Sequence, residues 1–281
     1  MRKLTNLNLG RPKPTNCTYC NRTCSGCKVH TKSLVCYTKN KNMSLNKNLY
    51  LPFKEEQHLI TTHYGNGEKH QIIVPPQLQL NQGMFLPDHI IEQEEFRPNY
   101  GLKPKDLIAF NYAKAEYNKG IISDKCVHFY LNDYMFLCIN NHPLRYTSML
   151  ISYPMVISPD NSVYLNWTEH ERRQSAWRNQ QMTRLWQANS IPVIFNVSWA
   201  GPNSYSYCIH VYPKHCVIAI NCMGIKGDPD ACYFWHLGYE EVLKSLEPSL
   251  IIRYGDKMEG ENEDISLYFN NPIITRLKNG R

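Results

Sequence analysis

Six short runs of apolar residues recur in the second half of the chain and predict β-strands. They are rich in β-branched and aromatic residues and are bounded by turn-forming residues. Because the runs are nearly continuous, they favour strands that are buried on both faces, as in a parallel sheet. The runs are VHFYLND (127–133), PMVISPD (154–160), IPVIFNVSW (191–199), HCVIAINCMG (215–224), SLIIRYGD (249–256) and ISLYFNN (265–271).

Two helices are predicted between these runs. Residues 168–188 begin with Thr168 as a helix N-cap, and Glu171 follows three residues later to complete a capping box. Within residues 231–247 five apolar residues share one helical face, namely Trp235, Tyr239, Val242, Leu243 and Leu246. Strands and helices joined by short loops imply right-handed βαβ units. The sequence therefore predicts an α/β fold of parallel βαβ units, either barrel-like or doubly wound.

Polar residues occupy the carboxyl ends of these predicted strands. In parallel α/β folds this edge of the sheet holds ligands, because the loops converge there. The alternative is that these residues only end strands and begin turns. The residues are Asp133, Asp160, Asn196 with Ser198 and Trp199, Asn221 with Cys222, and Tyr254 with Asp256.

The chain divides into three regions by composition. Residues 1–50 form a basic, cysteine-rich module, and residues 51–120 form a connecting region with irregular or short-strand structure. Residues 121–281 form the α/β domain. The first 50 residues contain ten lysines and arginines and no acidic residue, which leaves 21 basic against 24 acidic residues in the rest of the chain. The net charge of +7 therefore belongs to the amino-terminal module.

A basic module of this kind favours a polyanionic partner, most simply DNA or RNA. Lysine and arginine contact phosphates without regard to base sequence, and interspersed aromatic rings can stack on unpaired bases. The alternative is a solvated basic tail that has no partner. The candidate nucleic-acid-binding residues are Lys13, Arg22, Lys28, Lys32, Lys39 and Lys41.

Five cysteines within the same module predict a metal site, and the candidate ligands are Cys17, Cys20, Cys24, Cys27 and Cys36. Two Cys-x2-Cys pairs suit tetrahedral zinc, although the three residues between the pairs are fewer than in ordinary zinc ribbons. The alternative is a [4Fe–4S] cluster, because the spacing Cys20-x3-Cys24-x2-Cys27 is the one found in radical S-adenosylmethionine enzymes. Unligated thiols are disfavoured by the density of cysteines.

Several classes of protein find no support in the sequence. No apolar stretch approaches 18 residues, and the first residues lack the apolar core of a secretory signal. We therefore expect a cytoplasmic protein without disulfides and without a membrane partner. Gly-rich phosphate loops, GxSxG and HExxH are absent from the sequence, so the common NTPase, hydrolase and zincin classes are not indicated.

Four segments resemble an uncharacterised family, domain of unknown function 4417, which occurs in bacteria, their phages and other mobile elements. The resemblance covers roughly residues 125–270 and implies a phage or mobile-element protein in a bacterial cytoplasm. It implies no established activity. The segments are VHFYLNDYMF (127–136), VISPDNS (156–162), WRNQQMTRLWQANSIPVIFNVSW (177–199) and GYEEVLKSLEPSLIIRYGD (238–256).

Four residues at strand ends within these segments are the candidate catalytic residues: Asp133, Asp160, Trp199 and Tyr254. The two carboxylates are expected to share a divalent ion or to act as acid and base. The leading hypothesis is a phage nucleic-acid-associated protein whose amino-terminal module docks on DNA or RNA and whose strand-end edge holds a ligand or cleaves a bond. Two alternatives stay open: an iron–sulfur enzyme resembling radical S-adenosylmethionine proteins, and a non-catalytic protein that binds a host defence or replication factor.

Overall fold

The computed structural model describes residues 58–63, 69–75, 78, 80–81, 84–85 and 91–271. Its strands are β1 (His58–His63), β2 (Lys69–Val74), β3 (Leu80–Asn81), β4 (Met84–Phe85), β5 (Leu107–Ala109), β6 (Cys126–His128), β7 (Val156–Ile157), β8 (Val193–Asn196), β9 (Val217–Asn221), β10 (Leu250–Tyr254) and β11 (Ser266–Phe269). Its α-helices are α1 (Phe110–Asn118), α2 (Leu137–Asn141), α3 (Pro143–Leu150), α4 (Glu169–Ala188), α5 (Tyr205–Cys208) and α6 (Pro229–Leu246).

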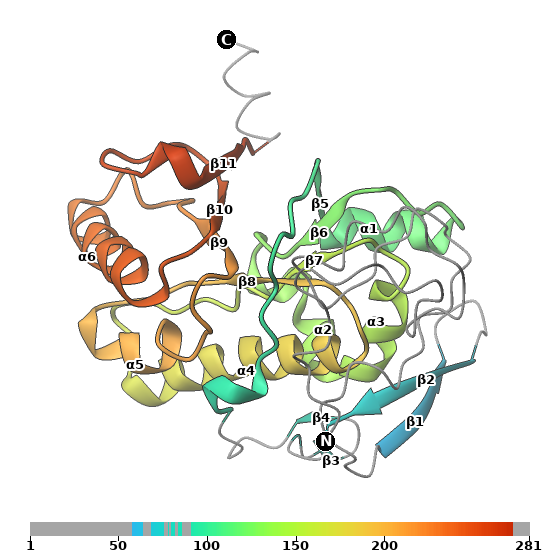
Figure 1. The fold of residues 1–281 in the computed structure, drawn as a ribbon. Helices are drawn as coiled ribbons and strands as arrows, with labels where there is room; N and C mark the ends of the chain where they lie inside the picture. Colours follow the sequence, from blue (N-terminus) through green and yellow to red (C-terminus); the bar gives the residue numbers. More distant parts are fainter. Residues whose placement is uncertain are drawn as a thin grey trace, which may run out of the picture. The chain divides into compact units, whose positions relative to one another are not determined.

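A seven-stranded sheet organises the described part of the chain, with the order β11-β10-β9-β8-β7-β6-β5 (Figure 1). Every neighbouring pair is parallel, and each strand lies beside the strand that precedes it in the sequence. The sheet curls into a half-barrel that ends at β5 on one side and at β11 on the other. The α/β fold and the barrel-like winding are therefore confirmed. The doubly wound alternative is wrong, because the strand order never reverses.

Two apolar cores cover the two faces of this sheet. Alternate residues of one strand enter different cores: Val127 and Phe129 pack on the helix side, whereas Cys126 and Tyr130 pack on the concave side. Strands buried on both faces need apolar residues at every position, which explains the nearly continuous runs in the sequence. All six predicted runs contain strands, β6 to β11.

Both predicted helices form. Thr168 caps α4, its hydroxyl oxygen accepting the backbone N–H of Glu171 at 3.3 Å, while the Glu171 carboxylate accepts the backbone N–H of Thr168 at 2.8 Å. Along α6, Trp235, Tyr239 and Val242 are among the buried residues of the predicted face. These two long helices fill the outer layer beside β8 and β10 (Figure 1).

The connecting region contributes to the sheet itself. Its short run Leu107–Ala109 forms the edge strand β5, which pairs with β6. Upstream, the Asn99 side chain joins the amino-terminal ends of β8 and β9: its Nδ2 donates to the carbonyls of Val193 and Val217 at 2.8 and 2.7 Å, and its Oδ1 accepts the N–H of Val217 at 2.7 Å. These bonds link two strands where their own pairing has not yet begun.

The predicted cysteine-rich basic module lies outside the described residues, as do its five candidate metal ligands and six candidate nucleic-acid-binding residues. The proposed boundaries of the three regions stay predictions. Within the described ranges, no helix combines the length and the apolar character needed to cross a membrane.

Candidate functional site

Asp160 is the centre of a polar cluster at the mouth of the half-barrel, by which we mean the edge where the carboxyl ends of the strands meet. It lies three residues after β7. Its Oδ1 accepts the Asn196 amide at 2.8 Å, and its Oδ2 accepts the Asn221 amide at 3.1 Å. Asn196 ends β8 and Asn221 ends β9, so three adjacent strands deliver the carboxylate and its two donors.

Both amides are themselves held in place. Asn196 Nδ2 also donates to the carbonyl of Pro159 at 3.2 Å, and the backbone N–H of Asn196 donates to the Ser158 hydroxyl at 2.7 Å. Asn221 Oδ1 accepts the N–H of Met223 at 2.8 Å. These bonds fix the orientation of each amide, so that its NH₂ group points at Asp160.

The environment of Asp160 raises the pKa of its carboxyl. Burial is the largest cause, because it removes water that would stabilise the charged form, and the nearby Asp133 carboxylate adds repulsion. The amides of Asn196 and Asn221 act in the opposite direction and favour the ionised form. The side chain is still partly exposed. A recessed, oriented carboxyl with a raised pKa is suited to exchanging a proton with a ligand.

Aromatic rings form the wall beside Asp160. The Tyr130 hydroxyl donates to Asn196 Oδ1 at 3.1 Å, which connects it to the carboxylate. The Tyr130 ring stacks on Tyr254 with centroids 4.8 Å apart, and the His128 ring lies 4.7 Å from Tyr254. β6 and β10 are four places apart in the sheet, so contact between their side chains is a direct consequence of its curl. Burial raises the pKa of Tyr254 to about 12.

His128 is buried in this wall in its neutral form. Burial lowers the pKa of the imidazole to about 4, because the charged ring would lose its hydration. Its Nδ1 accepts the backbone N–H of Tyr130 at 3.2 Å, so the neutral ring carries its hydrogen on Nε2. We name Asp160, Asn196, Asn221, Tyr130, Tyr254 and His128 the mouth cluster.

Asp133 joins two loops and does not enter the mouth cluster. Its two oxygens accept the hydroxyl and the backbone N–H of Ser162 at 2.9 and 3.1 Å. This ties the loop after β6 to the loop that carries Asp160. The next residue, Asn161, is also anchored, since its N–H and its amide both donate to Asn179 of α4, at 2.9 and 2.6 Å.

Trp199 faces helix α6. Its indole N–H donates to the carbonyl of Phe234 at 3.1 Å, and its ring lies against Gly238. A Cβ atom at position 238 would come within 2.0 Å of Trp199 Nε1, so only glycine allows this approach. Trp199 thus holds the loop after β8 to the helix layer.

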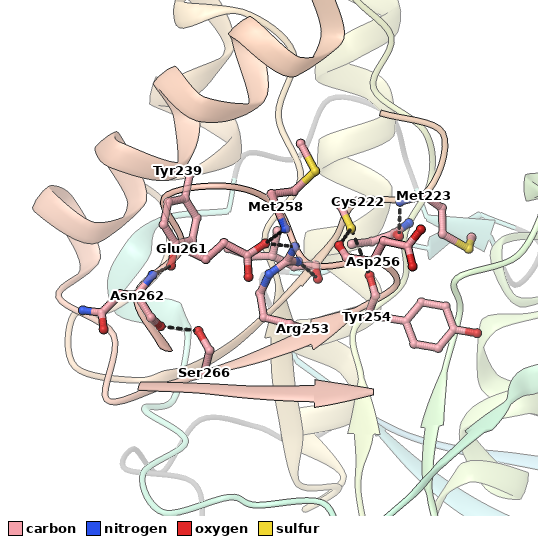
Figure 2. Close-up of polar contacts among 12 residues, drawn as sticks. Cys222, Met223, Tyr239, Arg253, Tyr254, Asp256, Met258, Glu261, Asn262 and Ser266 are labelled. Carbon is pink, nitrogen blue, oxygen red and sulfur yellow. Dashed lines mark hydrogen bonds and ion pairs between the residues drawn. The ribbon is translucent and has the colours of Figure 1, made fainter. Parts of the chain in front are cut away.

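The loop between β10 and β11 is held by a buried ion pair (Figure 2). Arg253 donates to Glu261 Oε1 and to the carbonyl of Ile220, both at 2.5 Å. The Arg253 and Glu261 side chains are 1% and 0% exposed. Figure 2 shows the Tyr254 side chain directed away from this pair, so consecutive residues of β10 serve opposite faces of the sheet. The Cys222 thiol donates to the carbonyl of Asp256 at 2.6 Å and links β9 to the same loop.

The prediction of a metal site at the five amino-terminal cysteines stays a prediction, because these residues lie outside the described ranges. No group of three or more His, Cys, Asp or Glu side chains is placed to hold a metal ion within the described part of the chain. Its cysteines are free, and four of them, Cys126, Cys208, Cys216 and Cys222, are buried. Burial raises the pKa of each of these four thiols. All four pack within the apolar cores.

Of the four candidate catalytic residues, the structure brings Asp160 and Tyr254 into the mouth cluster. His128 and Tyr130 belong to the same cluster and were not among the candidates, although both lie within the run VHFYLND. Alternation along a strand places them on one face with Cys126 and opposite to Val127 and Phe129. That alternation was the available signal.

Comparison with known proteins finds two curated phage proteins of similar sequence. The Gene 1 protein of Mycobacterium phage D29 is 28% identical over 156 residues, which cover 54% of this chain and 56% of the relative. The Gene 1 protein of Mycobacterium phage L5 is 25% identical over 139 residues, which cover 50% of this chain and 61% of the relative. The chain thus spans little more than half the length of these relatives. No solved structure matches it.

A family profile matches residues 88–274, which include the whole seven-stranded sheet and the mouth cluster. Its description is "Domain of unknown function (DUF4417)". The match extends upstream of the segments that carry the resemblance in the sequence and takes in Asn99 and β5. The chain belongs to the DUF4417 family.

Proposed function

We propose that this chain is a phage nucleic-acid-associated protein with two working parts. The basic amino-terminal module docks on the phosphates of DNA or RNA, and the mouth of the half-barrel holds a ligand at Asp160. The similarity to two phage Gene 1 proteins supports the phage setting. The concentration of positive charge in residues 1–50 supports the polyanionic partner.

The arrangement around Asp160 is the observation that carries the ligand site. A carboxyl that only ended a strand would be solvated or would cap the following helix. Asp160 instead accepts two amides from the next two strands, and its pKa is raised by burial and by Asp133. Parallel half-barrels place ligands at this edge. We assign Asp160 the role of proton acceptor or donor, and the role of ligand contact to Tyr254.

The docking part is tested by charge substitution in the full chain. Binding of end-labelled DNA and RNA is measured by fluorescence anisotropy at rising salt concentration. The test variant replaces Lys28, Lys32, Lys39 and Lys41 with Gln, and the matched control replaces Lys103, Lys119, Lys226 and Lys244, all exposed lysines of the described part. Each lost phosphate contact lowers the salt slope by about 0.7 to 0.9.

We expect the test variant to bind far more weakly, with a shallower salt slope, and the control to bind nearly as the unaltered protein does. Equal weakening by both variants would contradict an amino-terminal docking module. Elemental analysis of the anaerobically purified protein tests the accompanying metal proposal. We expect one zinc per chain, held by thiolates among Cys17, Cys20, Cys24, Cys27 and Cys36. Three or four irons with matching sulfide would instead favour the iron–sulfur alternative.

A further inference from the structure

Two polar groups of the mouth cluster lack a partner. The Tyr254 hydroxyl makes no hydrogen bond with any described residue, although the side chain is only 5% exposed. His128 is 3% exposed, and its Nε2–H likewise makes no hydrogen bond within the described part of the chain. Both polar atoms reach the surface of the mouth and are not sealed in the core, so together with the Asp160 carboxyl they can bond to one ligand.

The charge of the mouth cluster disfavours anionic ligands. It contains one carboxyl and no lysine or arginine, and Arg253 lies on the opposite face in its pair with Glu261. Phosphates and carboxylates would therefore meet repulsion and no compensating cation. A divalent ion would find too few ligands among the described residues. The donor His128 Nε2–H beside the acceptor Asp160 favours a neutral molecule that both donates and accepts hydrogen bonds.

The loops beside the mouth carry exposed aromatic rings. Tyr164 lies four residues after Asp160 on the same loop and is 55% exposed, and it meets Trp167 edge to face with centroids 4.9 Å apart. Tyr134 follows Asp133 on the neighbouring loop and is 75% exposed. Exposed rings beside a recessed polar site are suited to stacking on flat, polar molecules.

We infer that the mouth binds an unpaired nucleobase, with His128 Nε2–H and Asp160 serving as donor and acceptor to the base edge. The Tyr254 hydroxyl is the third group that contacts the base, since it can either donate or accept a hydrogen bond. Nucleobases are neutral and planar, and their edges carry donors beside acceptors, which matches the three groups. Tyr164 then stacks on the neighbouring base when the nucleobase belongs to a strand. This inference rests on the proposed ligand site and names its ligand.

The test uses the full chain, the four free nucleosides and the four single-stranded homo-oligonucleotides. Nucleoside binding is measured by calorimetry and strand binding by fluorescence anisotropy. Tyr254→Phe removes one hydroxyl and keeps the ring stack on Tyr130, and Tyr112→Phe is its control at an exposed position of α1. We expect one base to bind best and Tyr254→Phe to weaken that base about tenfold, the effect of one hydrogen bond. The control should not change binding.

Tyr164→Ala distinguishes a free nucleoside from a base within a single strand. Loss of a stacking ring should weaken the oligonucleotide about tenfold and leave the free nucleoside unaffected, whereas Tyr112→Ala should change neither. If Tyr164→Ala weakens neither ligand, the stacking role of Tyr164 is overturned. Selective binding of one base that is insensitive to Tyr254→Phe would overturn the assignment of the mouth.

Failure of this inference can be told apart from failure of the proposed ligand site. Suppose that no base binds selectively, but that a different neutral ligand binds and that Asp160→Asn abolishes its binding. This result would overturn only the assignment of a nucleobase as the ligand. Binding of every ligand unchanged by Asp160→Asn would overturn the site itself. Asp264→Asn, at an exposed position before β11, is the matched control for this substitution.

Discussion

His128 shows how burial assigns a chemical state to a single residue. Its ring is enclosed by Tyr130 and Tyr254, and its Nδ1 accepts a backbone N–H. A positive charge there would be unsolvated and would repel that N–H. The ring is therefore neutral well above pH 4, and it offers one donor of fixed direction.

The same burial predicts how stability depends on pH. The pKa of His128 is about 4 in the folded protein and about 6.5 in the unfolded chain. The unfolded chain therefore takes up a proton first, and the free energy of unfolding falls as pH drops from about 6.5 towards 4. The loss from this residue is about 3 kcal/mol. Urea denaturation at pH 7.5 and pH 4.5 measures it, with His128→Gln for comparison.

The His128→Gln variant should lose this part of the pH dependence, because glutamine has no proton to gain in this range. A variant with an unchanged difference between the two pH values would show that other groups dominate. The sequence alone could not indicate this behaviour. A histidine in an apolar run is simply predicted to be a strand residue. The pKa of His128 depends on contact with Tyr254 of β10, which lies over 120 positions away in the sequence.

At the scale of elements, the strands and helices with extended sequence patterns were predictable. The apolar runs predicted β6 to β11, the capping box predicted α4, and the apolar face of residues 231–247 predicted α6. β5 was predicted only as short-strand structure of the connecting region and not as a strand of the sheet, because its three apolar residues carry too little pattern. The short helices α2, α3 and α5 are held mainly by tertiary packing, which local sequence does not record.

Helix α6 offers a test of how the helix layer positions a loop. Alanine normally stabilises a helix by about 1 kcal/mol relative to glycine. At Gly238 we predict the opposite: a Cβ would overlap the Trp199 indole, so Gly238→Ala should destabilise the protein by about 1 to 3 kcal/mol. Thermal unfolding measures this, and tryptophan fluorescence reports the displaced indole.

Gly227→Ala is the control, since a Cβ there meets no atom within 4 Å. It should change stability little. If Gly238→Ala were as stable as the unaltered protein, the loop after β8 would not depend on the contact between Trp199 and α6. Such a result would also free Trp199 for the catalytic role that its position in the sequence had suggested.

At the scale of the whole molecule, the order of winding creates the site. Because each strand is added beside the previous one, the sheet curls in one direction, and its strand ends converge from β6 to β10. That convergence brings Tyr130 to Tyr254 and both asparagines to Asp160. Strand patterns predict parallel pairing, but open and closed sheets share the same patterns. The curl of the sheet, and therefore which residues meet in the mouth cluster, could be seen only in the three-dimensional structure.

The central claim is that Asp160 is a recessed, proton-exchanging carboxyl at the mouth of this half-barrel. A carboxyl ¹³C NMR titration of the full chain measures it most directly, with Asp160→Asn identifying the signal. The account predicts a pKa clearly above 3.8, the ordinary value for aspartate, because burial and Asp133 outweigh the two amides. A pKa at or below 3.8 would mean that the hydrogen bonds to Asp160 outweigh burial and keep it ionised, and it would contradict the role of Asp160 as a proton-exchanging carboxyl.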